Sequence, residues 1–382
     1  MAAYPGAQGS GSAESRWAAS LTVTEEIVNA AAAFRVGEGI SAGAITQKVN
    51  LPMMGELEVS LDLAIIGVTV TMSPAHGGRL HTAVRATGEV SFGAGSPMPA
   101  LPGKPVVRAD VLVPVRVEFR PDGRFIAMLD LANAEVDALT LEAIEGANID
   151  ADTLHAMGSM LFGSIGPDLF GGLTASMDTI GIELDPVQAR PLAQIGVRAA
   201  PADIIVGDGT LTIGLPSVEG VEGHASVALR PGQHIGAGVS AGALTQIAYR
   251  VMEDSFGVPL PFDVDLTPAN TEVGARIRNR RLTNSPLIPD LRPGVRTAVA
   301  ARLVGERIHL SPREAWVELP LVPSFVNRFN RAVGSLASLA PVSTSLPAKA
   351  DLPVGDGASV GLAVTELAMR PDGVSAVIDV VL

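Results

Sequence analysis

The chain contains one eleven-residue segment twice, and this repeat constrains its fold more than any other feature. Residues 37–47 read GEGISAGAITQ and residues 236–246 read GAGVSAGALTQ, with eight identities and two exchanges among isoleucine, valine and leucine. A repeat of this length within 382 residues indicates a duplicated unit. The sequence therefore predicts two similar modules of roughly 200 residues, each with the same order of elements.

The composition is unusually apolar. Hydrophobic residues make up 47% of the chain, whereas aromatic residues make up 4% and charged residues 18%. The mean hydropathy is +0.34, yet no uninterrupted apolar stretch reaches the roughly 18 residues of a membrane-spanning helix. The surplus apolar surface is therefore expected in a large core, in an interface, or in a cavity that takes an apolar guest.

The formal net charge of −13 argues against nucleic acid as a partner, because a polyanion is bound through clustered basic residues. One local exception is the basic run Arg276 to Arg281. It is interpreted as a solvated strand or turn, and the alternative is a local contact with an anionic head group. The chain has no cysteine, which excludes disulfides and thiolate chemistry.

The first residues show neither a basic start nor an apolar run, so no secretory signal peptide is expected. Residues 1–16 are predicted to be a flexible leader. The expected location is cytoplasmic, with export by a non-classical route as the alternative.

Each predicted module begins with a helix and continues with long strands. Thr22 to Glu25 has a capping pattern for a helix that continues to Phe34, and Ser41 and Ser240 are expected to cap the next helix of each module. Period-two alternation predicts antiparallel strands with one buried face at residues 56–63, 80–92, 106–119, 125–136, 262–266, 295–304 and 307–319.

Each module is predicted to end with an amphipathic helix and a strand pair. Helical spacing of apolar residues marks 152–177 and 323–339, and strand pairs with Pro-Asp-Gly or Gly-Asp-Gly turns follow at 197–215 and 360–382. The predicted modules are residues 17–217 and 218–382. The fold class is α+β and β-rich, with a long twisted antiparallel sheet wrapped around an amphipathic helix in each module.

This order of elements resembles the tubular lipid-binding superfamily, which includes bactericidal permeability-increasing protein. The resemblance covers about 360 residues and rests on the early helices, the late helices and the closing strand pairs described above. It implies two pseudo-symmetric modules in which an apolar groove between helix and sheet binds lipid acyl chains. The implied groove-lining residues, each also compatible with ordinary core packing, are Ile27, Met157, Leu161, Ile165, Leu244, Ile247, Val251, Phe325, Phe329, Val333 and Leu336.

Catalytic and metal sites are weakly indicated. Three G-x-S-x-G matches centre on Ser41, Ser240 and Ser359. A nucleophile elbow needs a buried strand before the serine, and none is predicted before Ser41 or Ser240, while no histidine follows Ser359 in the chain. The six histidines lack ligand spacing, so neither a metal nor a cofactor is expected.

The predicted function is therefore non-enzymatic binding, and in some settings transfer, of a lipid, with transient contact to a membrane. The first alternative is a structural or assembly component of a bacterial toxin or particle complex, whose apolar surface forms a homo-oligomer or a contact with another protein. The second is a serine esterase that uses Ser240 with His309.

Overall fold

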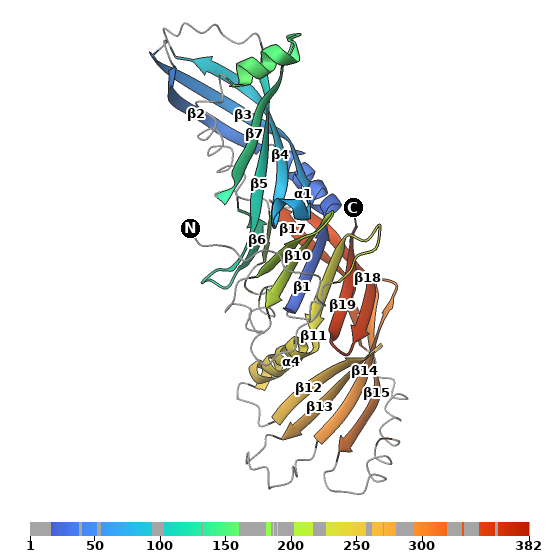
Figure 1. Ribbon diagram of the computed structural model, residues 1–382. Helices are drawn as coiled ribbons and strands as arrows, with labels where there is room; N and C mark the ends of the chain where they lie inside the picture. Colours follow the sequence, from blue (N-terminus) through green and yellow to red (C-terminus); the bar gives the residue numbers. More distant parts are fainter. Residues whose placement is uncertain are drawn as a thin grey trace. The chain divides into compact units, whose positions relative to one another are not determined.

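Figure 1 shows the computed structural model of the chain. It describes residues 17–37, 40–51, 55–93, 103–130, 133–159, 181–184, 186, 189, 202–216, 227–256, 262–269, 271–279, 294–318, 331, 344–355 and 358–381. Strands dominate these residues, and each strand pair with a defined register is antiparallel. The β-rich α+β class predicted from the sequence is therefore confirmed.

The chain divides into two compact units. The first comprises Val23–Pro186 and Ile204–Leu211, and the second comprises Met1–Thr22, Val187–Asp203 and Thr212–Leu382. The predicted module boundary between residues 217 and 218 stays a prediction, because residues 217–226 lie outside the described part.

One sheet belongs to the first unit and has the strand order β2-β3-β4-β5-β6-β8, with β7 also paired to β5. These strands and the helix α1 are α1 (Glu25–Gly37), β2 (Ile40–Leu51), β3 (Gly55–Thr71), β4 (Arg79–Phe92), β5 (Pro105–Phe119), β6 (Phe125–Leu129), β7 (Glu135–Ile144) and β8 (Gly181–Leu184). A short 3-10 helix, η1 (Pro74–His76), joins β3 to β4.

Two further sheets complete the described fold. A five-stranded sheet has the order β12-β13-β14-β15-β16, and a seven-stranded sheet has the order β17-β18-β19-β11-β1-β10-β9. Their elements, with helix α4, are β1 (Trp17–Thr24), β9 (Asp203–Val206), β10 (Thr210–Pro216), β11 (Ile235–Ser240), α4 (Ala241–Phe256), β12 (Phe262–Ala269), β13 (Glu272–Asn279), β14 (Gly294–Val304), β15 (Arg307–Glu318), β16 (Thr344–Pro347), β17 (Lys349–Gly355), β18 (Ala358–Arg370) and β19 (Gly373–Val381).

Most strands predicted from alternation are present, and the differences are local. Residues 125–136 contain the whole of β6 and the first residues of β7, because the chain turns after β6, where the Asn133 N–H donates to the Asp130 carbonyl. Strands β1, β2, β8, β11, β16 and β17 were not predicted. Of the late helices, only 151–159 and Arg331 are described, so a sheet wrapped around a helix stays a prediction.

The repeated segment does not fold the same way twice. In the first copy Gly37 ends α1 and residues 40–47 lie in β2, whereas in the second copy residues 236–240 form β11 and 241–246 begin α4. Ser41 therefore lies in a strand opposite Ala64, and its prediction as a helix cap is wrong. Strand pairing overrides the local preference of these residues, which suit either structure.

Helix α1 completes the hydrogen bonding of β3. Strand β2 pairs with β3 only as far as Ile65. Beyond this point the Asn29 side chain donates to the Val70 carbonyl at 2.8 Å and accepts from the Val70 N–H at 2.6 Å. The Glu25 carboxylate accepts from the Met72 N–H at 2.7 Å. Side chains of α1 thus take the place of a neighbouring strand.

Helix α4 is anchored in a similar way. The N–H of its first residue, Ala241, donates to the Asp372 carbonyl at 2.9 Å, as the Glu25 N–H of α1 donates to the Gly209 carbonyl at 2.9 Å. Both acceptors lie at turns between paired strands. The Thr245 hydroxyl then accepts from the Leu266 N–H of β12 at 2.9 Å. Each helix therefore satisfies backbone groups of the strand beside it.

The core of the first unit lies on one face of its sheet. Along β3, Val59, Leu63 and Ile65 are buried, and after an irregularity between Ile65 and Gly67 the buried residues become Val68 and Val70. This β-bulge shifts the alternation by one residue, so the same face stays inward along the whole strand. The displaced Ile66 is 46% exposed.

We expect Asn29→Ala to lower the free energy of unfolding by about 1–3 kcal/mol, because it leaves both polar groups of Val70 unpaired. Alanine is the better helix former, so helix propensity alone predicts the opposite sign. Urea unfolding measures the change. The control is Asn133→Ala, which removes an exposed hydrogen bond to Asp130 and should change stability by less than about 0.5 kcal/mol. Equal effects of the two variants would contradict the edge role of Asn29.

Candidate functional site

The two faces of the five-stranded sheet differ in chemistry. Side chains alternate along a strand, and residues opposite one another across a pair share a face, so the register assigns each residue to one side. One side, the apolar face, has no charged residue among its described side chains. These are Val264, Leu266, Pro268, Val273, Ala275, Ile277, Val295, Thr297, Val299, Ala301, Leu303, Ile308, Leu310, Pro312, Ala315, Val317 and Leu346.

The opposite side, the charged face, includes Asp265, Glu272, Arg276, Arg278, Arg296, Arg302, Arg307, His309, Glu314 and Trp316. A register shift separates the two sets on β15: Ala298 pairs with Glu314 and Val299 with Pro312, which leaves Arg313 as an extra residue. Without this bulge, Leu310 and Ile308 would lie on the charged face.

Part of the apolar face is open to solvent. Val295 is 44% exposed, Val317 48% and Leu346 50%, and Val295 and Val317 lie directly opposite one another. At the other margin Val264 is buried, and α4 runs beside β12 (Figure 1). Exposed aliphatic side chains that adjoin one another on one face form a patch able to bind an apolar partner.

The predicted groove-lining residues are only partly placed. Ile27 lies in α1, Met157 in the helix of residues 151–159, and Leu244 and Ile247 in α4, all half-buried. Val251 also lies in α4, but its side chain is outside the described part. The others lie outside the described residues: Leu161, Ile165, Phe325, Phe329, Val333 and Leu336. Their role as groove lining stays a prediction.

The candidate lipid-binding residues named from the sequence all lie on predicted helices, and none lies on the five-stranded sheet. The sequence does indicate an apolar face on this sheet, since Val295, Val299 and Leu303 alternate with Arg296 and Arg302 along one strand. Alternation alone does not predict the register between strands. The register aligns β13, β14 and β15 so that their apolar residues share one face.

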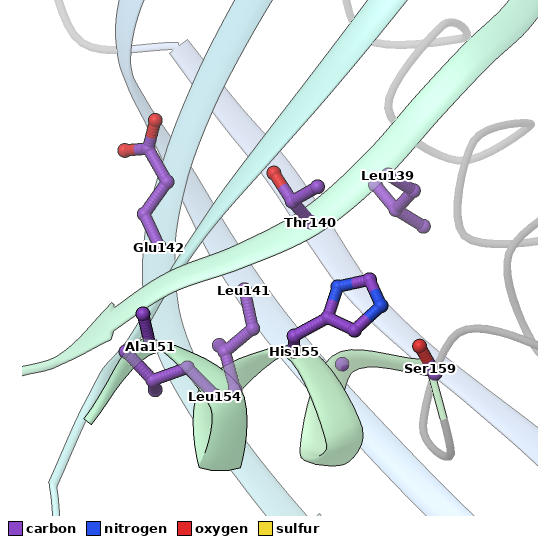
Figure 2. Close-up of a pocket in the computed structure, with 9 residues that line it drawn as sticks. Leu139, Thr140, Leu141, Glu142, Ala151, Leu154, His155 and Ser159 are labelled. Carbon is purple, nitrogen blue, oxygen red and sulfur yellow. The ribbon is translucent and has the colours of Figure 1, made fainter. Parts of the chain in front are cut away.

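A small pocket lies between β7 and the helix of residues 151–159 (Figure 2). Its volume is about 140 Å³, well below the roughly 300–1,000 Å³ of typical ligand sites, so it is too small for an acyl chain. Met157 is on this helix but not in the lining, which consists of Leu139, Thr140, Leu141, Glu142, Ala151, Leu154, His155, Gly158 and Ser159.

Asp150 caps the helix that borders this pocket. Its carboxylate accepts from the Thr153 N–H at 2.9 Å and from the Thr153 hydroxyl at 2.7 Å. These hydrogen bonds, first the one from the backbone N–H, lower the pKa of Asp150 below its usual range. The cap fixes where the helix begins and therefore how it lies against β7.

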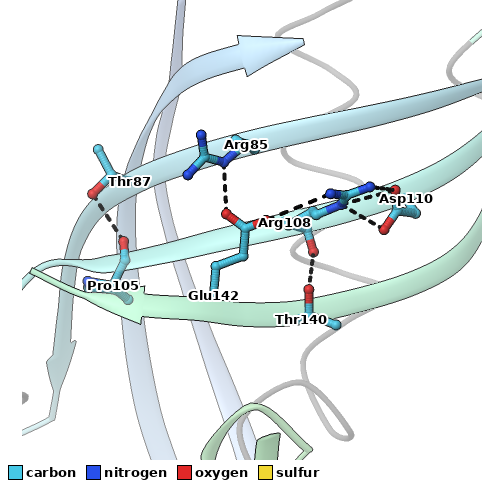
Figure 3. A network of polar contacts seen from close by, with 7 residues as sticks. All are labelled: Arg85, Thr87, Pro105, Arg108, Asp110, Thr140 and Glu142. Atoms are coloured by element: carbon cyan, nitrogen blue, oxygen red, sulfur yellow. Dashed lines mark hydrogen bonds and ion pairs between the residues drawn. The ribbon is translucent and has the colours of Figure 1, made fainter. Parts of the chain in front are cut away.

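A polar network covers the outer side of the same sheet (Figure 3). Arg85 of β4 lies opposite Arg108 of β5, and the bulged residue Glu142 places its carboxylate 2.7 Å from Arg85 Nε and 3.9 Å from Arg108 Nη1. Arg108 also donates to Asp110, and this hydrogen bond followed by the charge of Asp110 raises the pKa of Arg108. The charges satisfy one another, so the network stabilises strand pairing and offers no reactive group.

Ser240 is a helix cap. Its hydroxyl accepts from the Ala243 N–H at 3.1 Å and the residue is 0% exposed, which confirms the predicted capping. The prediction that no buried strand precedes Gly238 is wrong, since β11 lies there and Gly236 and Gly238 are buried. A fully buried hydroxyl cannot reach a substrate, so this geometry does not support an esterase that uses Ser240 with His309.

Metal binding and membrane spanning were considered for the described residues. None of them form a group of three or more His, Cys, Asp or Glu residues that could hold a metal ion. No helix in the described part is both long and apolar enough to span a bilayer.

No family model and no curated protein sequence matches the chain. Among solved structures, P47 from Clostridium botulinum A2 aligns with a TM-score of 0.41 and 10% identity, covering 94% of this chain and 96% of that one. P47 of Clostridium botulinum E1 gives 0.41 and 9%, covering 95% and 99%. A lipopolysaccharide binding protein gives 0.29 and 12%, covering 96% and 99%. At these TM-scores the alignments do not establish a common fold, so membership of the tubular lipid-binding superfamily stays a prediction.

Ser240→Ala should lower the free energy of unfolding by about 1 kcal/mol, because the Ala243 N–H loses its acceptor at the start of α4. Urea unfolding measures this loss, and hydrolysis of a nitrophenyl ester is followed in parallel. Any background hydrolysis should be the same in both proteins. Ester turnover that disappears in the variant while stability is unchanged would restore the nucleophile interpretation.

Proposed function

We propose that the protein binds the hydrocarbon part of a lipid on the apolar face of the five-stranded sheet. The observation that carries this proposal is the uncharged face whose valines Val295 and Val317 are nearly half exposed. Its described side chains are aliphatic, proline or threonine, so an acyl chain would meet no charge to desolvate.

The dimensions of the sheet suit a long acyl chain. Strand β14 has 11 residues, so at about 3.3 Å per residue it extends roughly 36 Å. The sheet has five strands, and at about 4.8 Å between neighbours it is roughly 19 Å wide. A chain of about 16 carbons can therefore lie along or across the strands without leaving the face.

The expected affinity is modest. Burying a methylene group contributes about 0.8 kcal/mol, so a chain of about 16 carbons gains roughly 12 kcal/mol when fully enclosed. A face that covers one side of the chain gives about half of this, before the cost of ordering the ligand. Such binding is readily reversible, which suits a protein that takes up and releases lipid.

Among the described residues, the inward face of the sheet in the first unit offers no comparable opening. The inward side chains of its sheet are closed to solvent, with Val70 at 0% exposed, Leu80 at 1% and Val113 at 0%. A single apolar face, in the second unit, therefore supports the proposal. The sequence left open whether both modules bind lipid. This difference in burial favours lipid binding by the second unit alone.

The test uses two variants on the same strand. Val295→Glu places a charge on the apolar face, and we expect it to weaken binding of a fluorescent long-chain fatty acid by tenfold or more, since burying an unpaired carboxylate is costly. Val304→Glu is the control, because Val304 is 59% exposed and lies on the other side of β14. Binding is measured by fluorescence titration, and by mass spectrometry of solvent extracts.

Equal loss in both variants, or no loss in Val295→Glu, would overturn the lipid site. The assembly alternative predicts a different result. In that case solvent extracts contain no lipid, and light scattering shows an oligomer in the unmodified protein that Val295→Glu dissociates and Val304→Glu does not.

A further inference from the structure

Four polar side chains gather on the charged face of the five-stranded sheet, at the end where β14 turns into β15. Arg302 of β14 lies opposite His309 of β15, and His309 lies opposite Ser345 of β16. Opposite residues across an antiparallel pair have Cβ atoms about 4.5–5.5 Å apart. Arg307 of β15 joins them, since its Nε donates to the Ser345 hydroxyl at 2.8 Å. These four residues form one group, the basic patch, which the proposed lipid site does not use.

The neighbours of the basic patch along β14, β15 and β16 carry no carboxylate on this face. On one side Ala300 lies opposite Ser311. On the other side Val304 lies opposite Arg307, and Arg307 lies opposite Pro347. The residues that adjoin the patch on these strands are therefore small, apolar or hydroxylic, and none of them balances its positive charge.

Carboxylates farther out at this end of the sheet are bound by other cations. Glu306, in the turn between β14 and β15, lies 2.6 Å from Lys349 Nζ. Glu272, which is opposite Ala300, lies 3.6 Å from Arg313 Nε. Each of these carboxylates therefore has a cation of its own outside the basic patch.

The charge of the basic patch is unbalanced within the part of the chain that the structure describes. Arg302 is exposed, and neither it nor His309 makes a hydrogen bond or an ion pair with a described residue. The described partners of Arg307 are the hydroxyl and the carbonyl of Ser345, which are neutral. The arginines of Figure 3, in contrast, lie beside carboxylates. This patch occurs in a chain whose formal net charge is −13, so it is not a consequence of a generally basic composition.

We propose that the basic patch binds a phosphate-type oxyanion. The guanidinium groups of Arg302 and Arg307 supply N–H donors in a planar fork that matches the oxygens of phosphate. The His309 imidazole has an N–H donor whether it is neutral or charged. The Ser345 hydroxyl accepts from Arg307, which leaves its own proton free to donate. Donors from several side chains can meet different oxygens of a tetrahedral anion, whereas a carboxylate offers two.

The basic patch is open to a ligand from solution. Arg302 and Arg307 are exposed, and His309 and Ser345 are half-buried. An anion can therefore approach from the solvent side without displacing a carboxylate, since none pairs with these residues among those described. The phosphate can be free or part of a lipid head group, because both have this chemistry.

The test is a titration of the protein with inorganic phosphate at constant pH, followed by calorimetry and by the proton NMR signal of the His309 ring. That signal is the one missing from the spectrum of His309→Gln. We expect it to shift saturably with phosphate and to stay in place with chloride at the same ionic strength. Raising the salt concentration should weaken phosphate binding.

Substitutions of the arginines make the test specific. Arg302→Gln and Arg307→Gln should each weaken phosphate binding about tenfold, because each removes a charged hydrogen-bond donor. Arg302→Lys should also weaken it, since lysine keeps the charge but lacks the planar fork. The matched control is Arg370→Gln, which removes the same charge from an exposed position on β18 and should change binding less than about twofold.

Two results would overturn the site. One is an NMR shift that never saturates, and the other is equal weakening by Arg302→Gln and Arg370→Gln. Circular dichroism and urea midpoints confirm that each variant is folded.

The two glutamate variants of β14 separate this site from the lipid site. Val304 lies opposite Arg307, so Val304→Glu supplies a carboxylate to the basic patch and should weaken phosphate binding. Val295→Glu alters the other side of the sheet and should leave phosphate binding unchanged. The opposite pattern, with phosphate binding lost only in Val295→Glu, would contradict the site. A failed lipid test therefore leaves this one intact.

Vesicles distinguish the two sources of phosphate. If the basic patch binds a lipid head group, the protein sediments with vesicles of phosphatidylcholine that contain phosphatidic acid, and Arg302→Gln does not. If it binds free phosphate alone, the NMR shift is retained and neither protein sediments. Absence of both the shift and the sedimentation would refute the proposal.

Discussion

The structure depends on keeping the alternation of long strands in phase with a single buried face. A strand of ten or more residues twists, and one misplaced residue sends every later apolar side chain to the wrong side. The bulges at Ile66 and Arg313 each add one residue, which returns the later apolar side chains to the same face of the sheet. The bulges at Asp137 and Glu142 have the same effect where β7 pairs with β5. The inward core of the first unit and the apolar face of the second both follow from these corrections.

The bulge at Glu142 also shows how packing and electrostatics are combined. An extra residue in β7 brings a carboxylate between Arg85 and Arg108, which otherwise face one another as like charges. In the second unit Arg276 lies opposite Arg296, and the Arg296 guanidinium carbon lies 5.6 Å from the centroid of the Trp316 ring. The sheet that carries this second pair has an apolar side and a charged side.

The long strands could be predicted from the sequence because each has a clear period of two. The strands that were missed lack it: β11 is rich in glycine, and its place between β1 and β19 depends on partners far along the chain. The apolar face was missed for a related reason, since the residues were recognised as strand but their register was not. Alternation identifies a strand, whereas bulges and turns decide what lies beside it.

The hydrogen bonds from Asn29 and Thr245 to neighbouring strands have a consequence for the behaviour of the chain in concentrated solution. An uncovered strand edge recruits strands from other molecules, and an apolar sheet makes such self-association harder to reverse. Through these hydrogen bonds, helices α1 and α4 cover part of the edges of β3 and β12. Brief local unwinding of either helix would uncover an edge next to apolar side chains, so the onset of aggregation should follow the opening of these helices and precede global unfolding.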